Sequence, residues 1–169
     1  MKKIAIIGCG GSGKSTLARQ LSERLELEVI HLDQLFWSAG WNMADKEEQK
    51  KIHEQLNHKS NWIIDGNYSS TWDQRLDAAD TVIFLDFSRY LCIYRIFKRF
   101  LKHRKQTRPD MADGCEEQLD FDFLKWIWNY HNTNRPGTLA KIKSLPSDKR
   151  VIVLQKPKEV VRFLREIEA

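Results

Sequence analysis

Short apolar runs alternate with longer amphipathic stretches along this chain of 169 residues. The short runs are rich in Ile, Val and Leu, which is typical of strands buried on both faces of a sheet. We expect strands at 3–7, 28–32, 61–65, 80–86 and 150–154. Between and after these runs, apolar residues recur at helical spacing. We expect helices at 14–25, 45–58, 70–78, 89–102, 117–133, 137–144 and 157–167.

The alternation of strand and helix predicts one parallel sheet with helices on both faces, a three-layer α/β/α sandwich. No repeat, low-complexity tract or linker rich in Pro, Gly and Ser divides the sequence. We therefore expect a single domain over residues 1–169. Residues 103–115 have no periodicity and contain several helix breakers. Such a stretch predicts a mobile surface loop and a candidate lid.

A glycine-rich run follows the first predicted strand: Gly8-Cys9-Gly10-Gly11-Ser12-Gly13-Lys14-Ser15-Thr16. It matches the phosphate-binding pattern G-x-x-x-x-G-K-[ST] at every fixed position and precedes a predicted helix. Glycines let the backbone wrap around an anion, so that N–H groups and the helix N-terminus face the phosphates. Lys14 is expected to reach the β- and γ-phosphates, and Ser15 to ligate Mg²⁺. The expected nucleotide contacts are Gly8, Gly10, Gly11, Ser12, Gly13, Lys14, Ser15 and Thr16.

Carboxylates follow three of the predicted strands: Asp33, Asp65 and Asp86. Ligands of parallel sheets bind beyond the carboxyl ends of the strands. These side chains are therefore candidates for holding Mg²⁺-bound water or for accepting a proton from a substrate hydroxyl. Each also has a plainer interpretation, because Asp often caps the helix that follows. The turn at Asp86 is already explained by Ser88, a good helix cap, so we favour Asp33 and Asp65.

Aromatic residues recur in three places. Trp37 and Trp41 follow the second strand in an irregular run, where they could stack on a planar ligand or cover the sheet edge. Asn67 and Tyr68 could contact a substrate or complete the turn after the third strand. The helix predicted at 117–133 has apolar residues at a spacing that indicates packing: Phe123, Trp126, Ile127 and Tyr130.

The net charge of +5 comes from one segment of the chain. Between Arg89 and Arg108 there are eight Lys or Arg residues and no acid, which leaves 20 basic and 23 acidic residues elsewhere. Such a concentrated block indicates a local phosphate clamp more than a basic stripe for nucleic acid. Arg95 and Arg99 share one helical face, and Arg135 follows the next helix. We expect these three arginines to neutralise charge on a transferring phosphoryl group.

Cysteine usage and hydropathy indicate the compartment. The three cysteines are widely spaced and form no C-x-x-C pair, which disfavours a disulfide framework or a zinc site and favours a reducing cytosol. The first apolar stretch ends at Gly8, too early for a signal peptide, and no apolar run could span a membrane. We expect a cytoplasmic protein without a membrane partner, either a monomer or a weak dimer.

Five segments together resemble the nucleoside-monophosphate-kinase-like P-loop superfamily, which includes adenylate and shikimate kinases. They are most similar to the bacterial DNA topology modulation (FlaR-like) proteins. The segments are GCGGSGKSTLA (8–18), HLDQLFW with GW at 40–41, WIIDGNY (62–68), VIFLDFSR (82–89) and RIFKR (95–99). The resemblance implies a P-loop fold with five parallel strands in the order 2-3-1-4-5, an acceptor-binding helical region at about 34–60 and a small lid at about 100–118.

The resemblance also implies roles for single residues. RIFKR matches the adenylate-kinase lid opening R-I-x-x-R, so Arg95 is implied to contact adenine and Arg99 to contact phosphate. Asp65 matches the acid of their L-D-G-F-P-R strand end, which implies a role in the nucleotide and metal site. In the same motif Asn67 and Tyr68 replace Phe-Pro, and the arginine that follows is missing.

These inferences predict a kinase that transfers the γ-phosphoryl group of ATP, with Mg²⁺, to a small acceptor. Lys14 would hold the phosphates, Asp65 would orient water on the metal, and Asp33 would bind or deprotonate the acceptor hydroxyl. Arg95, Arg99 and Arg135 would close over the transferring group. Two alternatives stay open, a simple ATPase and an ATP-dependent regulator associated with nucleic acid. The second predicts steeply salt-dependent DNA binding, although no DNA-reading element is found in the sequence.

Overall fold

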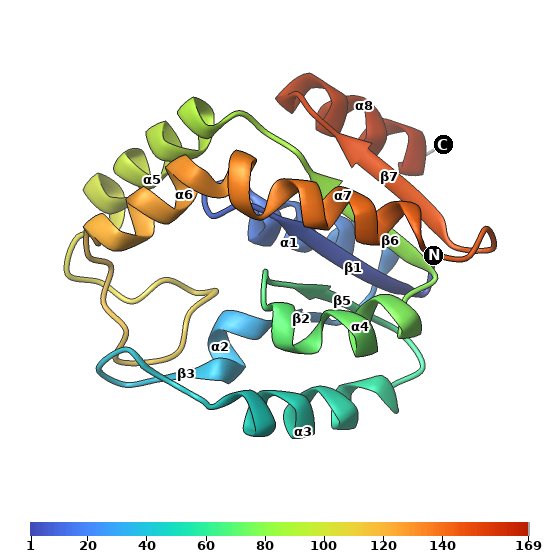
Figure 1. The fold of residues 1–169 in the computed structure, drawn as a ribbon, viewed down its shortest axis with the longest axis horizontal. Helices are drawn as coiled ribbons and strands as arrows, with labels where there is room; N and C mark the ends of the chain where they lie inside the picture. Colours follow the sequence, from blue (N-terminus) through green and yellow to red (C-terminus); the bar gives the residue numbers. More distant parts are fainter. Residues whose placement is uncertain (169) are drawn as a thin grey trace.

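Five short strands form one parallel sheet in the computed structural model, which describes residues 1–168 (Figure 1). The strands are β1 (Lys3–Gly8), β2 (Val29–His31), β5 (Trp62–Asp65), β6 (Thr81–Leu85) and β7 (Arg150–Leu154). They lie in the order β2-β5-β1-β6-β7. Counted over this sheet alone, the order is the predicted 2-3-1-4-5. The labels differ because two unpredicted strands, β3 and β4, intervene in the chain.

The central strand β1 is buried on both faces and separates two hydrophobic cores. Ile4 and Ile6 belong to one core, and Ala5 and Ile7 belong to the other. The helices of the first core are α1 (Lys14–Leu25), α5 (Arg89–His103), α6 (Phe121–Thr133) and α8 (Pro157–Glu168). The helices of the second core are α2 (Leu32–Phe36), α3 (Lys46–Asn57), α4 (Trp72–Ala78) and α7 (Arg135–Lys143). The predicted three-layer α/β architecture is confirmed.

Four helices begin one to four residues from the predicted position, and the starts of α6 and α7 have a clear physical cause. Helix α6 starts at Phe121 because Asp120 caps it, accepting hydrogen bonds from two backbone N–H groups of the first turn at 2.8 and 3.2 Å. Helix α7 starts at Arg135, and Pro136 lies in its first turn, where its missing N–H group costs nothing. The longest helix, α5, has 15 residues, and within residues 1–168 no helix has the length and apolar character needed to cross a bilayer.

The sequence analysis missed the elements that follow β2. The chain turns there into the short helix α2, so that Asp33 lies in a helical first turn and not at a strand end. A hairpin follows, formed by β3 (Trp37–Ser38) and β4 (Asn42–Met43). Elements of two to five residues are too short to show a period of 2.0 or 3.6, so hydropathy could not reveal them.

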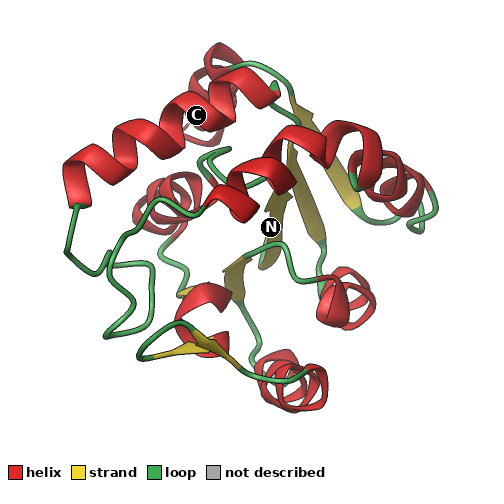
Figure 2. Cartoon of the chain, turned by 60° about the vertical axis from the view of Figure 1, so that its left-hand side comes forward, coloured by secondary structure: helices red, strands yellow, loops and turns green. Residues whose placement is uncertain are grey.

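The loop that joins α5 and α6, residues 104–120, is here called the lid loop. It folds back against the β3–β4 hairpin, as Figure 2 shows. The Gly40 N–H group donates to the Gly114 carbonyl oxygen at 3.1 Å, and Trp41 Nε1 donates to the Glu116 carbonyl oxygen at 3.2 Å. The hairpin and the lid loop therefore form one continuous rim above the carboxyl ends of the strands.

Candidate active site

The glycine-rich run forms a wrapped loop between β1 and α1. Gly11 and Gly13 have φ angles of 74° and 96°, in the left-handed region that favours glycine. No side chain caps the start of α1, so its first N–H groups are available to an anion. Lys14 Nζ donates to the carbonyl oxygens of Gly8 and Cys9, both at 2.9 Å. The loop thus has the shape and the charge of a phosphate-binding site.

Helix α5 approaches this loop so closely that Gly11 is expected to tolerate no side chain. A Cβ atom at Gly11 would lie 2.4 Å from the Cys92 carbonyl oxygen, in a strained backbone conformation. We expect Gly11→Ala to lower the free energy of unfolding by about 2–3 kcal/mol. The matched control is Gly137→Ala in α7, where nothing lies within 4 Å of the new Cβ. It should raise the free energy of unfolding by about 0.5–1 kcal/mol.

Urea unfolding of the two variants and the parent protein measures both effects. A Gly11→Ala variant as stable as the parent would contradict the close approach of α5 to the loop.

A cavity of about 1330 Å³ opens beside this loop. Its walls come from the phosphate-binding loop, the β3–β4 hairpin, the loop after β5, the lid loop and the helices α1, α2, α5, α6 and α8. The predicted site residues that line it are Gly10, Gly11, Ser12, Gly13, Lys14, Ser15, Thr16, Asp33, Asp65, Arg95 and Arg99. Gly8 ends β1 behind the loop. Phe123 and Trp126, interpreted as packing residues, also line this cavity.

Arg135 is the predicted catalytic residue that the structure does not bring to the cavity. Its Nε and Nη2 donate to the two carboxylate oxygens of Asp86 at 2.6 and 2.7 Å, a bidentate pair. Burial raises the pKa of Asp86, but the hydrogen bonds and charge of Arg135 outweigh it, and the pKa lies below its ordinary value. This pairing fixes α7 to the end of β6, and the geometry gives no support to a catalytic role for Arg135.

Arg95 connects α5 to the phosphate-binding loop. Its Nη1 donates to the Ser12 carbonyl oxygen at 2.7 Å, and its guanidinium lies 5.2 Å from the centroid of the Phe87 ring. Arg95 therefore lies beside the phosphate-binding loop, and its contacts with adenine and the transferring phosphoryl group stay predictions.

Asp33 is oriented by two aromatic side chains. Tyr68 Oη donates to Asp33 Oδ1 at 2.5 Å, and Trp37 Nε1 donates to Tyr68 Oη at 2.8 Å. Burial raises the pKa of Asp33, and the charge of Asp65 adds to this effect, while Tyr68 and Lys14 oppose it. The net pKa of Asp33 lies above its ordinary value, which suits a carboxylate that accepts a proton. Sequence reasoning considered Tyr68 and Trp37 as ligand contacts and missed this orienting role.

His31 and Asp65 form a buried pair that the sequence analysis also missed. They end the neighbouring strands β2 and β5 in register, and His31 Nδ1 lies 2.6 Å from Asp65 Oδ1. Burial lowers the pKa of His31, but the hydrogen bond and charge of Asp65 outweigh it, so the pKa lies above its ordinary value. In the sequence, the two residues can be recognised only as polar residues at the ends of two predicted strands. Their pairing follows from the strand order, which places β2 beside β5.

The raised pKa of His31 makes this pair stabilising at low pH. The stabilisation should be complete below the unfolded pKa of about 6.5 and lost as the pH rises through the raised pKa of the folded state. We expect His31→Gln to lower the free energy of unfolding by about 1–2 kcal/mol near pH 5.5 and by less near pH 9.

Denaturant unfolding at both pH values tests this expectation, with the exposed His58→Gln as the matched control. A His31→Gln effect of equal size at both pH values would mean that the charge of His31 contributes nothing.

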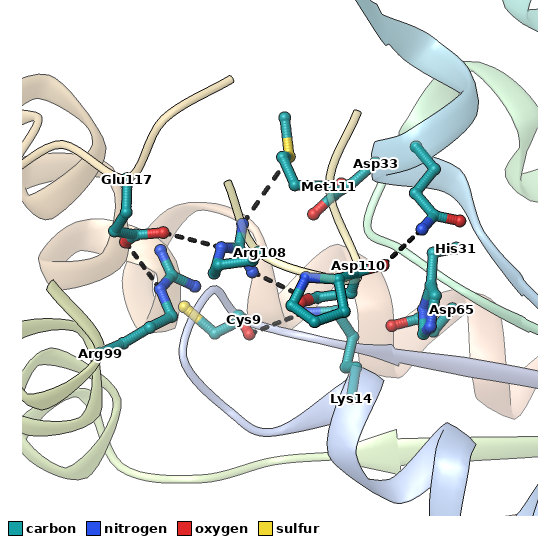
Figure 3. A network of polar contacts seen from close by, with 12 residues as sticks. Cys9, Lys14, His31, Asp33, Asp65, Arg99, Arg108, Asp110, Met111 and Glu117 are labelled. Carbon is teal, nitrogen blue, oxygen red and sulfur yellow. Dashed lines mark hydrogen bonds and ion pairs between the residues drawn. The ribbon is translucent and has the colours of Figure 1, made fainter. Parts of the chain in front are cut away.

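Ion pairs connect the lid loop to α5, within a network of polar contacts beside the phosphate-binding loop (Figure 3). Glu117 is almost completely buried. Its carboxylate accepts a hydrogen bond from Arg99 Nε at 2.8 Å and forms an ion pair with Arg108 Nε at 2.7 Å. Arg108 Nη1 in turn donates to Asp110 Oδ2 at 2.8 Å, and the Ser15 hydroxyl lies close enough to Asp110 to lower its pKa. Burial raises the pKa of Asp110, but Arg108 and Ser15 outweigh it, and the pKa lies below its ordinary value. The lid loop thus lies directly over the phosphate-binding loop.

The sequence analysis named Arg99 and missed Glu117 and Asp110. Both acids lie in a stretch without periodicity, where sequence alone does not tell a buried carboxylate from a solvated one.

A phosphate-binding loop at the end of a five-stranded parallel sheet, with a lid loop over the same cavity, defines a P-loop protein. The predicted resemblance to the nucleoside-monophosphate-kinase-like superfamily is consistent with the family and the relatives that follow. The chain belongs to the AAA domain family, whose family model matches residues 4–117. This match takes in the phosphate-binding loop, Asp33, Asp65 and most of the lid loop.

Two curated relatives are similar to most of the chain. The uncharacterized protein YqaC of Bacillus subtilis (strain 168) is 28% identical over 136 residues, which cover 78% of this chain and 74% of the relative. A shikimate kinase of Phocaeicola vulgatus is 29% identical over 140 residues, which cover 73% of this chain and 76% of the relative.

Solved structures of small-molecule kinases have the same fold. A shikimate kinase from Acinetobacter baumannii in complex with shikimate matches 99% of this chain and 90% of its own, with a TM-score of 0.62 at 14% identity. A gluconokinase from Sinorhizobium meliloti 1021 matches 98% of this chain and 89% of its own, with a TM-score of 0.55 at 16% identity. The chain therefore has a kinase-like P-loop fold.

Proposed function

We propose that this protein is a kinase that transfers the γ-phosphoryl group of ATP to a hydroxyl group of a small acceptor. One observation carries the proposal: the phosphate-binding loop and an oriented carboxylate of raised pKa, Asp33, line the same cavity. A phosphate site supports nucleotide binding alone, whereas the added proton acceptor supports transfer to a hydroxyl. The likeness to shikimate kinases and a gluconokinase supports the same class of reaction.

The residues present fit a nucleoside triphosphate bound with Mg²⁺. The first N–H groups of α1 have no side-chain cap, and Ser12 Oγ is buried without a hydrogen-bond partner in the described part of the chain. Ser15 Oγ would hold the ion, and Asp65, fixed by His31, would hold its water. When bound, Mg²⁺ supplies positive charge to the phosphate oxygens.

The residues of this chain would divide the reaction between them. The acceptor oxygen would bond to the γ-phosphorus as the bond to the leaving ADP oxygen breaks, and Asp33 would take the hydroxyl proton. Arg99 and Arg108 would exchange Glu117 for phosphoryl oxygens and offset their charge. We assign acceptor binding to α2 and the hairpin, which overlap the predicted region of about 34–60, and water exclusion to the lid near 100–118.

The position of the basic block favours this function over a nucleic-acid regulator. Of the eight basic residues between Arg89 and Arg108, five line the cavity: Arg95, Lys98, Arg99, Lys102 and Arg108. A regulator that binds DNA outside the cavity would be left with Arg89, Arg104 and Lys105.

The test is ADP release from Mg²⁺-ATP with a panel of nucleosides, nucleoside monophosphates, sugars and hydroxy acids, with Lys14→Ala as the control. An acceptor that raises turnover well above the background without acceptor would establish the kinase and name its substrate. The same low turnover with every compound, despite tight ATP binding, would overturn the proposal in favour of an ATPase or an ATP-sensing regulator.

A further inference from the structure

The acceptor side of the cavity differs in charge from the nucleotide side. We infer that the acceptor is an uncharged polyhydroxyl compound with a flat apolar face, an inference that rests on the proposed kinase function. The residues that line this side come from α2, the hairpin and the loop after β5. They are Asp33, Trp37, Trp41, Met43, Asn67 and Tyr68.

None of the described residues on this acceptor wall is basic. Every Lys and Arg that lines the cavity comes from α1, α5 or the lid loop, and Arg108 of the lid loop already pairs with Glu117 and Asp110. Arg75 lies behind the wall, fully buried, and does not line the cavity. The cations whose charge reaches Asp33 are Lys14 and Arg108, which the proposed reaction uses on the phosphates of ATP. An acceptor with its own phosphate or carboxylate would therefore face the Asp33 carboxylate with no further cation to offset its charge, which is unfavourable in a partly desolvated site.

The wall has two side-chain oxygens that can accept hydrogen bonds from a ligand. Tyr68 occupies Asp33 Oδ1, while Oδ2 makes no hydrogen bond to any described residue. Asn67 Oδ1 is buried and also has no partner among these residues. A ligand that satisfies both oxygens must donate hydrogen bonds, as hydroxyl groups do.

Two tryptophan rings dominate the apolar part of the wall, and one of them, Trp41, lies in a strained turn between β3 and β4. The Trp37 and Trp41 rings pack edge to face, with centroids 5.5 Å apart and an interplanar angle of 75°. Trp41 has a φ of 61°, a conformation rare for a bulky residue, and the hydrogen bond from its Nε1 to Glu116 fixes the ring. Strain of this kind is characteristic of ligand clamps. Indole rings placed in this way suit the flat apolar face of a sugar or nucleoside ring.

Binding measurements with matched pairs of compounds test the inference. Calorimetric titrations with Mg²⁺ and a non-hydrolysable ATP analogue would compare adenosine with AMP, thymidine with dTMP, and glucose with glucose 6-phosphate. We expect the uncharged member of at least one pair to bind ten or more times tighter than its phosphorylated counterpart. Binding of adenosine or thymidine would identify the acceptor as a nucleoside, and binding of glucose would identify it as a free sugar. Equal or tighter binding of the phosphorylated members, or no binding of any uncharged member, would overturn the inference.

A charge added to the wall provides a second test. Asn67→Arg should reduce the preference for uncharged compounds at least tenfold by improving the binding of the phosphorylated members. The matched control is Asn61→Arg, at the opposite end of β5 and exposed, which should leave the preference unchanged. An unchanged preference in Asn67→Arg would mean that the charge of this wall does not select the ligand.

The two hypotheses can fail separately. ADP release driven preferentially by an anionic acceptor would overturn the inference and leave the kinase function in place. An uncharged compound that binds in the calorimeter but never raises ADP release above the background would overturn the kinase function and leave the ligand class in place.

Discussion

Lys14→Ala is expected to abolish phosphoryl transfer while leaving the protein folded. Among the described residues, Lys14 Nζ donates to the carbonyl oxygens of Gly8 and Cys9. Loss of the side chain therefore changes the loop locally and leaves the hydrophobic core intact. In the proposed reaction this ammonium offsets charge on the β- and γ-phosphates. We expect turnover to fall by about 10³-fold or more. Steady-state ADP release measures turnover, and urea unfolding measures the free energy of unfolding.

The matched control is Lys59→Ala, which removes an exposed lysine that pairs with Glu28 at 2.7 Å. It should leave turnover unchanged and alter the free energy of unfolding by less than about 1 kcal/mol. Retained activity in Lys14→Ala would refute the assignment of the phosphate-binding loop.

Asp33→Asn should reduce transfer far more than it reduces ATP binding. The substitution keeps an oxygen that can accept the Tyr68 hydroxyl, so the packing of the wall is preserved. It removes the group that takes the acceptor proton, and a general base of this kind contributes about 10²–10⁴-fold to a rate. We expect single-turnover transfer to fall by this factor, while the dissociation constant of ATP changes by about twofold or less.

The control for Asp33→Asn is Asp77→Asn, at an exposed position of α4. Both quantities should match those of the parent protein in this control. Equal losses of transfer and ATP binding in Asp33→Asn would mean that Asp33 serves the nucleotide or the fold.

The sheet could be predicted from the sequence because its strands are buried on both faces. Residues such as Ile4 to Ile7 must all be apolar in that environment, and a continuous apolar run is readable without knowing its neighbours. The phosphate-binding loop could be predicted for a different reason. Its glycines are demanded by the backbone itself, as the φ angles of Gly11 and Gly13 show.

The contacts around the cavity depended on information that a single sequence does not contain. His31 meets Asp65 only because β2 lies beside β5, and Glu117 meets Arg99 only because the lid loop folds back. Arg135 was expected at the cavity on its charge alone, and its position was decided by Asp86 at the end of β6. In each case the partner is a residue that is distant in the sequence and is brought close by the fold.

The hydrogen bonds that join the hairpin to the lid loop make one rim out of the acceptor wall and the nucleotide cover. A ligand that orders one part of the rim therefore reduces the conformational entropy that the other part loses when a second ligand binds. Such linkage is reciprocal: the factor by which an acceptor tightens nucleotide binding equals the factor by which the nucleotide tightens acceptor binding. A water molecule in place of the acceptor would order neither part of the rim. The closed rim would therefore be most populated when both substrates are bound, and less populated around the nucleotide alone.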